Sequence, residues 1–92
     1  MAKKACKIII KGRVQGVGFR FFTQDKAQDY GITGYVKNLF DGTVEVQAQG
    51  EEDKLKVFIE ELKSGPQMAH VENTDIRWLE AENQYDSFTI EH

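Results

Sequence analysis

The chain is short and carries a small net negative charge. It has 92 residues, of which 40% are hydrophobic and 29% charged, with a formal net charge of −3. This length predicts one domain over residues 1–92, because single cores rarely divide below about 150 residues. The charge disfavours electrostatic binding to nucleic acid or to an anionic membrane. No apolar run approaches the roughly 20 residues of a membrane-spanning helix. We therefore expect neither nucleic acid nor membrane as a partner.

The N-terminal residues and the cysteine content indicate a compartment. Met1-Ala2-Lys3-Lys4 is followed by no apolar signal-peptide core. The single cysteine, Cys6, cannot form an internal disulfide, which favours a reducing environment. A small core residue is the simplest role for it. We expect a cytoplasmic monomer.

The first element in chain order is a strand that leads into a glycine-rich loop. Cys6, Ile8 and Ile10 alternate with Lys7, Ile9 and Lys11, which predicts a strand with one buried face, although Ile9 interrupts the polar face. The loop continues as Gly12-Arg13-Val14-Gln15-Gly16-Val17-Gly18-Phe19-Arg20. Glycine permits consecutive backbone N–H groups to converge on one point, and a helix N-terminus and an arginine add positive charge. The loop therefore predicts an anion-binding site, formed by the amides from Gln15 to Arg20.

A helix and a hairpin follow the loop. Apolar positions from Phe19 to Tyr30 recur at helical spacing, and Gly31 stands where a left-handed C-cap residue belongs. A second strand is predicted over 33–40 and a third over 43–49, with Val44, Val46 and Ala48 facing the core. Asp41-Gly42 between them indicates a two-residue hairpin turn.

The second half of the chain predicts another helix and two strands. Leu55, Phe58, Ile59 and Leu62 stand at i, i+3, i+4 and i+7. Asp53 is a candidate N-cap, and Ser64-Gly65-Pro66 ends the helix. Weaker patterns predict strands over 71–79 and 87–91. The order is β-α-β-β-α-β with a short extra strand. It indicates an α+β ferredoxin-like sandwich, with two helices on one face of a mostly antiparallel sheet.

This topology brings two distant polar residues to one edge of the sheet. The first helix descends about 15 Å, and the strand after it climbs about 17 Å back up. Asn38 should then end near the level of Arg20. Arg20 can bind two phosphoryl oxygens through its planar guanidinium, and Asn38 can orient a water without ionising. Together they favour hydrolysis of an activated phosphate.

Other phosphate chemistries need residues that the loop lacks. A cysteine-dependent phosphatase needs its nucleophile six residues before the arginine, where this chain has Val14. A nucleotide P-loop needs Gly-Lys-Ser/Thr, and a dinucleotide fingerprint needs a third glycine where Phe21 stands. An RNA-recognition domain shares the element order, but its aromatic motif must lie on the third strand. Water remains as the nucleophile. We expect no metal and no cofactor.

Two long segments resemble the acylphosphatase family. The loop Gly12–Arg20 matches the family's phosphate-binding motif, and Gly34–Glu45 matches its second motif. The resemblance implies metal-free hydrolysis of a carboxyl phosphate to carboxylate and inorganic phosphate. It implies that Arg20 binds the phosphoryl group and that Asn38 positions the attacking water. Phe40 stands where the family often has a polar residue, which could alter the mouth of the site.

One alternative of a different class remains open at this point. The same fold could serve as a non-catalytic domain that binds anions or regulates another protein. Small-molecule acyl phosphates are the expected substrates, with inorganic phosphate or other anions as product or inhibitor. For phosphate binding the predicted set is Gln15, Gly16, Val17, Gly18, Phe19 and Arg20, and for catalysis it is Arg20 and Asn38.

Overall fold

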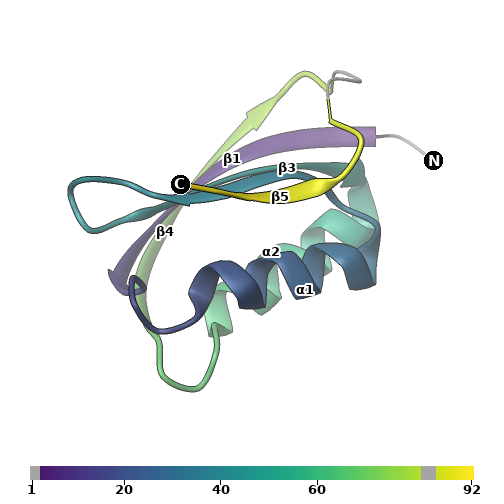
Figure 1. The fold of residues 1–92 in the computed structure, drawn as a ribbon. Coiled ribbons are helices and arrows are strands. Elements are labelled where there is room, and N and C mark those ends of the chain that lie inside the picture. The colour runs from purple at the N-terminus through teal and green to yellow at the C-terminus, as the bar shows by residue number, and fades with distance from the viewer. Residues whose placement is uncertain (1–2, 82–84) are drawn as a thin grey trace.

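Two helices pack on one face of a five-stranded sheet. The computed structural model describes residues 3–81 and 85–92. The elements in chain order are β1 (Lys3–Arg13), α1 (Phe19–Tyr30), β2 (Thr33–Asn38), β3 (Val44–Glu51), α2 (Glu52–Ser64), β4 (His70–Leu79) and β5 (Phe88–Glu91). Figure 1 shows both helices on the same side of the sheet. This is the predicted ferredoxin-like α+β arrangement.

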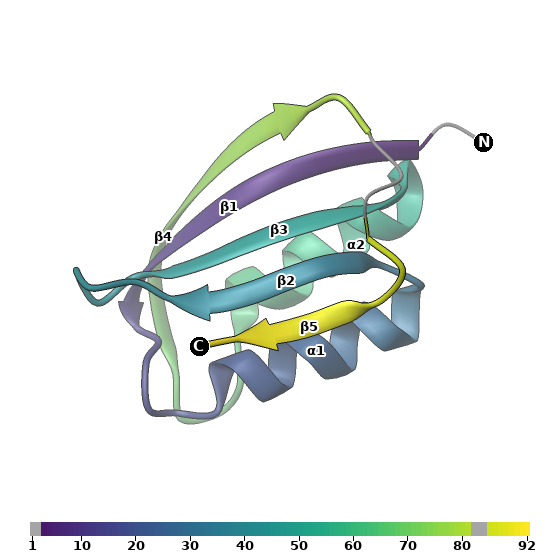
Figure 2. The same ribbon diagram turned by 45° about the horizontal axis from the view of Figure 1, so that its top comes forward.

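The strands are ordered β4-β1-β3-β2-β5, and the sheet is mixed. β1 pairs antiparallel with β3 and β4, and β2 pairs antiparallel with β3. β5 alone among the described strands runs parallel to its neighbour, with Val36 of β2 opposite Ile90. Figure 2 shows β2 and β5 pointing toward the same edge of the sheet. The residues that end these two strands therefore lie side by side.

The first helix has the bounds that the apolar spacing predicts. α1 spans Phe19–Tyr30, and Gly31 ends it with a left-handed φ of 68°. The Gly31 N–H donates to the carbonyls of Ala27 and Gln28, as expected for a glycine C-cap. α1 packs against β2 and β5.

The second helix is also confirmed, but its predicted N-cap is wrong. Glu51 precedes α2 in an extended conformation, and no side chain caps the helix. Asp53 lies inside the first turn, where its Oδ1 accepts a hydrogen bond from the N–H of Lys54 at 3.0 Å. Three successive acidic residues left the cap position ambiguous. Their charge still favours the N-terminal end of a helix.

The hairpin between β2 and β3 is longer than the two-residue turn predicted. Leu39 accepts a hydrogen bond from the Gly42 N–H at 3.2 Å and donates its own N–H to Thr43 at 2.9 Å. Gly42 has a φ of 90°. This is a three-residue connection in which a tight turn is followed by a glycine with positive φ. β2 accordingly ends at Asn38 and not at Phe40.

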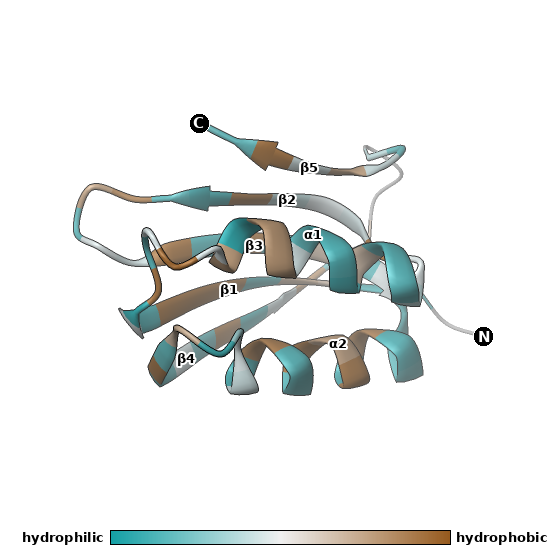
Figure 3. Ribbon diagram, turned by 60° about the horizontal axis from the view of Figure 1, so that its bottom comes forward, coloured by the Kyte–Doolittle hydropathy of each residue, from teal (hydrophilic) through white to brown (hydrophobic). Residues whose placement is uncertain are grey.

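The core lies between the sheet and the helices. Figure 3 shows the hydropathic colouring from the helix side. The strand residues that face the helices are fully buried and alternate with half-buried ones, as β3 shows with Val44, Val46 and Ala48. The largest fully buried side chains include Phe19, Phe58, Ile8, Ile10, Leu55 and Leu62. Phe19 belongs to both the core and the start of α1, so core packing fixes the end of the glycine loop.

Candidate active site

The glycine loop is held in the core at both ends. Val14 follows β1 and Phe19 begins α1, and each side chain is 1% exposed. Between them Gly16 and Gly18 have left-handed φ values of 73° and 78°. An added Cβ at either glycine would meet no atom within 4 Å. Glycine is therefore favoured here by the backbone conformation and not by lack of space.

A small cavity of about 190 Å³ lies where the loop, the start of α1 and the end of β2 meet. It is lined by Val14, Gly16, Gly18, Phe19, Arg20, Phe21 and Asn38. Arg20 and Asn38 thus face one space although 18 positions separate them in the chain. The β-α-β path places them together in the way the topology predicts. Their roles in catalysis remain predictions.

Arg20 is tethered to the residues that end β5. Its Nη1 donates to the carbonyl of Glu91 at 3.3 Å and lies 3.4 Å from Nδ1 of His92. The N–H groups of Nη2 and Nε take part in neither contact. Nothing in the sequence near His92 indicates that it lies beside the arginine. A parallel β2–β5 pair, if recognised, would have indicated the contact, because it brings both strand ends to one edge.

Asn38 occupies the last position of β2 on the helix-facing side of the sheet. Its pairing partner Val44 is fully buried. The Asn38 Oδ1 is buried and has no hydrogen-bond partner among the described residues. An unpaired buried acceptor costs about 1–3 kcal/mol, and most buried polar atoms in proteins have a partner. With Oδ1 enclosed, Nδ2 is the end of this amide that can reach a molecule in the cavity.

The Gln15 side chain has a structural role that the sequence did not indicate. Its Nε2 donates to the carbonyls of Leu39 and Thr43, each at 2.8 Å. Both side-chain N–H groups therefore tie the glycine loop to the β2–β3 hairpin. Only the backbone N–H of Gln15 remains a candidate for phosphate. Like Gln15, Val17 does not line the small cavity; its side chain packs against the core.

The hairpin beside Asn38 has its own internal support. Asp41 Oδ1 accepts hydrogen bonds from the N–H of Thr43 at 3.0 Å and from its Oγ1 at 2.6 Å. These bonds, chiefly the one from the hydroxyl, hold the pKa of the Asp41 carboxyl below its usual value. A turn fixed in this way keeps Leu39 in place for Gln15, and with it the end of β2.

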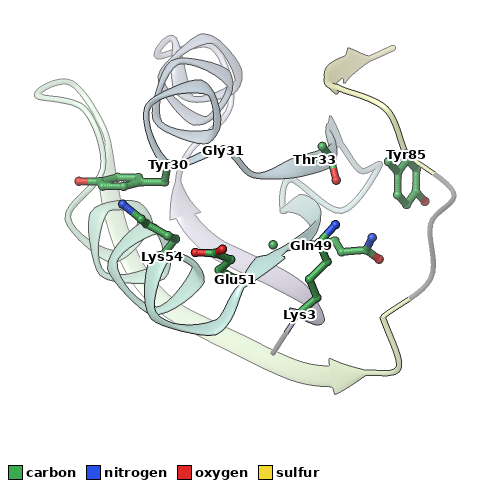
Figure 4. Close-up of a pocket in the computed structure, with 9 residues that line it drawn as sticks. Lys3, Tyr30, Gly31, Thr33, Gln49, Glu51, Lys54 and Tyr85 are labelled. Atoms are coloured by element: carbon green, nitrogen blue, oxygen red, sulfur yellow. The ribbon is translucent and has the colours of Figure 1, made fainter. Parts of the chain in front are cut away.

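A second hollow of about 380 Å³ lies at the opposite end of the sheet. Figure 4 shows side chains from the end of α1, the start of β1 and the end of β3 around it, including Tyr30, Lys3 and Glu51. None of the predicted site residues lines it. Its mixed charges form no converging set of phosphate donors, so the small cavity beside Arg20 is the better candidate.

Cys6 is enclosed in the core and is not placed to act as a nucleophile. The side chain is fully buried, and burial raises the pKa of its thiol to about 12.

Across residues 3–81 and 85–92, no group of three or more His, Cys, Asp or Glu side chains could hold a metal ion. Among the helices of the same residues, none is long and apolar enough to cross a bilayer.

The fold and the loop define a ferredoxin-like domain whose arginine and asparagine face one cavity. The acylphosphatase family model matches residues 6–90. An acylphosphatase from Caldanaerobacter subterraneus subsp. tengcongensis is 48% identical over 96% of this chain and 98% of its own length. One from Archaeoglobus fulgidus is 49% identical over 94% and 96%. The crystal structure of acylphosphatase from Bacillus subtilis has a TM-score of 0.93 and 37% identity, and covers 97% of this chain and 99% of that one.

The chain belongs to the acylphosphatase family. Relatives this similar over nearly the whole chain support acylphosphatase function, and with it a small-molecule acyl phosphate substrate and phosphate as product.

Proposed function

We propose that this chain hydrolyses acyl phosphates with Arg20 holding the phosphoryl group and Asn38 holding the attacking water. The observation that carries the proposal is that both side chains line one cavity of about 190 Å³. The left-handed glycines and the start of α1 complete its wall, where backbone N–H groups and the helix dipole favour an anion.

The reaction needs charge stabilisation and positioning more than a strong base. The water oxygen attacks phosphorus, the P–O bond to the acyl group breaks, and its electron pair leaves on the carboxylate. The protons of the water remain on the phosphate oxygens, so acyl phosphate and water give carboxylate and dihydrogen phosphate. A carboxylate leaves readily, which is why no carboxylate base or metal is required. Loop amides and Arg20 stabilise the charge on the phosphoryl oxygens.

Asn38 fits the water-positioning role through Nδ2. An N–H that donates to one lone pair of the water leaves the other lone pair free to attack phosphorus. Its Oδ1 is buried, which leaves Nδ2 as the end of the amide that can face the cavity. Arg20 fits the phosphate role because Nη1 is held by Glu91 while Nη2 and Nε remain available.

The test is hydrolysis of benzoyl phosphate in excess EDTA, with inorganic phosphate as inhibitor. Arg20→Gln should lower kcat by about 10²–10³-fold, as expected for the loss of a preorganised donor, and should weaken phosphate inhibition. Asn38→Ala should lower kcat while phosphate inhibition survives. Arg77→Gln and Asn73→Ala, at exposed positions of β4, are matched controls that should keep full activity. Equal loss of phosphate affinity in both site variants would contradict this division of roles, and loss of turnover in EDTA would contradict the metal-free reaction.

We also infer that the chain works as a cytoplasmic monomer and a single domain. The two proposed catalytic residues, Arg20 and Asn38, already meet in one cavity within a single copy of the chain. Light scattering of the purified protein at assay concentration tests the monomer.

A further inference from the structure

The direction in which the acyl group leaves follows from the position of the water. Attacking and leaving oxygens lie roughly in line on opposite sides of the phosphorus in phosphoryl transfer. If Asn38 holds the water, the acyl group must extend from the opposite side of the phosphoryl group. This step rests on the function proposed above.

The small cavity has walls from two layers of the fold. Asn38 ends β2 and belongs to the sheet, whereas Phe21 lies in the first turn of α1 and belongs to the helix layer. Figure 1 shows α1 beneath the sheet, with its start close to the edge where the strands turn. A phosphoryl group between these walls would have its water toward the sheet and its acyl oxygen toward the helix. Two apolar residues of α1, Phe19 and Phe21, line the cavity, and of these two Phe19 is buried in the core whereas Phe21 is exposed.

Phe21 is unusual for a large apolar residue of this helix. It is 69% exposed, whereas its neighbour Phe19 is 1% exposed and Phe22 packs on the core. Nothing in the packing of α1 requires an aromatic ring at this position. An aromatic ring with free surface beside a phosphate-sized cavity is suited to bind an apolar group attached to the phosphate.

We propose that Phe21 forms the acyl subsite and gives the enzyme a preference for acyl phosphates with an apolar, ring-sized acyl group. A benzoyl group can pack on the Phe21 ring and remove apolar surface of both from water. An acetyl group has only a methyl to offer. The chain should therefore favour benzoyl phosphate over acetyl phosphate, and the preference should depend on Phe21.

A neighbouring cavity of about 530 Å³ provides the contrasting possibility. It shares Asn38 with the small cavity, and its other lining residues are Gln15, Lys37, Leu39, Phe40 and His92. Phe40 is fully exposed there, so it too could pack on an acyl group. This cavity lies on the Asn38 side, however, where in-line attack places the water. The geometry of the reaction assigns it to the solvent that supplies the water and not to the acyl group.

The two exposed phenylalanines permit a matched experiment. We would measure kcat/KM for benzoyl and acetyl phosphate in wild type, Phe21→Ala and Phe40→Ala, with urea unfolding as the check on folding. Phe21→Ala should lower the benzoyl-to-acetyl ratio by about 5- to 30-fold, from the loss of ring contact and buried apolar area. Phe40→Ala should leave the ratio within twofold, and Phe21→Leu should retain part of the preference.

The outcomes separate this inference from the proposed function. A ratio that falls in Phe40→Ala but not in Phe21→Ala would place the acyl group in the neighbouring cavity and overturn the inference. An unchanged ratio in both variants would also overturn it, while turnover of either substrate leaves the proposed function intact. Failure of the wild type to hydrolyse both substrates would overturn the proposed function and the acyl subsite with it.

Discussion

The bond pair made by Gln15 offers a direct test of how the site is held together. Its Nε2 donates to Leu39 and Thr43, on either side of the hairpin that follows Asn38. Gln15→Ala removes both bonds and leaves two partly buried carbonyls without this donor. A net contribution of about 0.5–1.5 kcal/mol for each bond gives a loss of about 1–3 kcal/mol in the free energy of unfolding. The measurement is urea unfolding at 25 °C.

Gln15→Ala should also lower kcat, independently of its effect on the free energy of unfolding. Asn38 precedes Leu39, so a looser hairpin lets the amide drift from the water it holds, and small displacements of a positioning group cost rate. We expect kcat to fall more than phosphate inhibition weakens, under conditions where the variant is fully folded.

Two further variants make the interpretation specific. Gln15→Glu should be less stable than Gln15→Ala near neutral pH, because a carboxylate would face two carbonyl oxygens. Gln67→Ala, at an exposed loop position, should change the free energy of unfolding by no more than about 0.5 kcal/mol. If Gln15→Ala unfolds with the wild-type midpoint and slope, the two bonds contribute nothing to stability, and Gln15 does not hold the loop and the hairpin together.

Two other predictions concern the sheet. Gly34→Ala should lower the free energy of unfolding in urea by at least about 2 kcal/mol. The reason is that φ is 137° and an added Cβ would overlap the backbone carbonyl of Gln47. Wild-type stability of this variant would show that β2 and β3 can separate to make room. Cys6 should resist thiol reagents at pH 8 until the protein unfolds, since it is fully buried. Burial raises the pKa of this thiol from 9.0 to about 12, so its contribution to stability is complete below pH 9 and is lost as the pH rises toward 12. Cys6→Ala should remove that part of the alkaline loss, and rapid labelling of the folded protein would contradict the enclosure.

The parts of the fold that sequence predicts well are those whose causes are local. α1 has its predicted bounds because the residues that determine them, the apolar core face and the glycine C-cap, all lie within 13 consecutive positions. The hairpin was placed correctly but given the wrong length, since Asp41-Gly42 fits both a two-residue turn and the longer connection found. Both turn types place a glycine with positive φ at the same position, so the local sequence does not distinguish between them.

The long-range contacts of the site had no local cause to reveal them. Gln15 lies in a glycine-rich loop, which suggests a residue that faces an anion. Nothing near it in the sequence indicates that its side chain reaches carbonyls 24 and 28 positions away. Asn38 could be placed beside Arg20 because helix and strand lengths determine where a β-α-β unit returns. No comparable measure predicts which side chain fills a gap between two loops.

The parallel pairing of β2 and β5 has a consequence for how tightly the arginine is held. It brings Glu91 to the edge where Asn38 ends, directly above the start of α1. Arg20 is therefore held by a backbone carbonyl, which no side-chain substitution at Glu91 removes. A guanidinium restrained before the substrate arrives loses less conformational entropy on binding. The C-terminal end of an antiparallel neighbour would lie at the other side of the sheet, so Glu91 itself would be out of reach of Arg20.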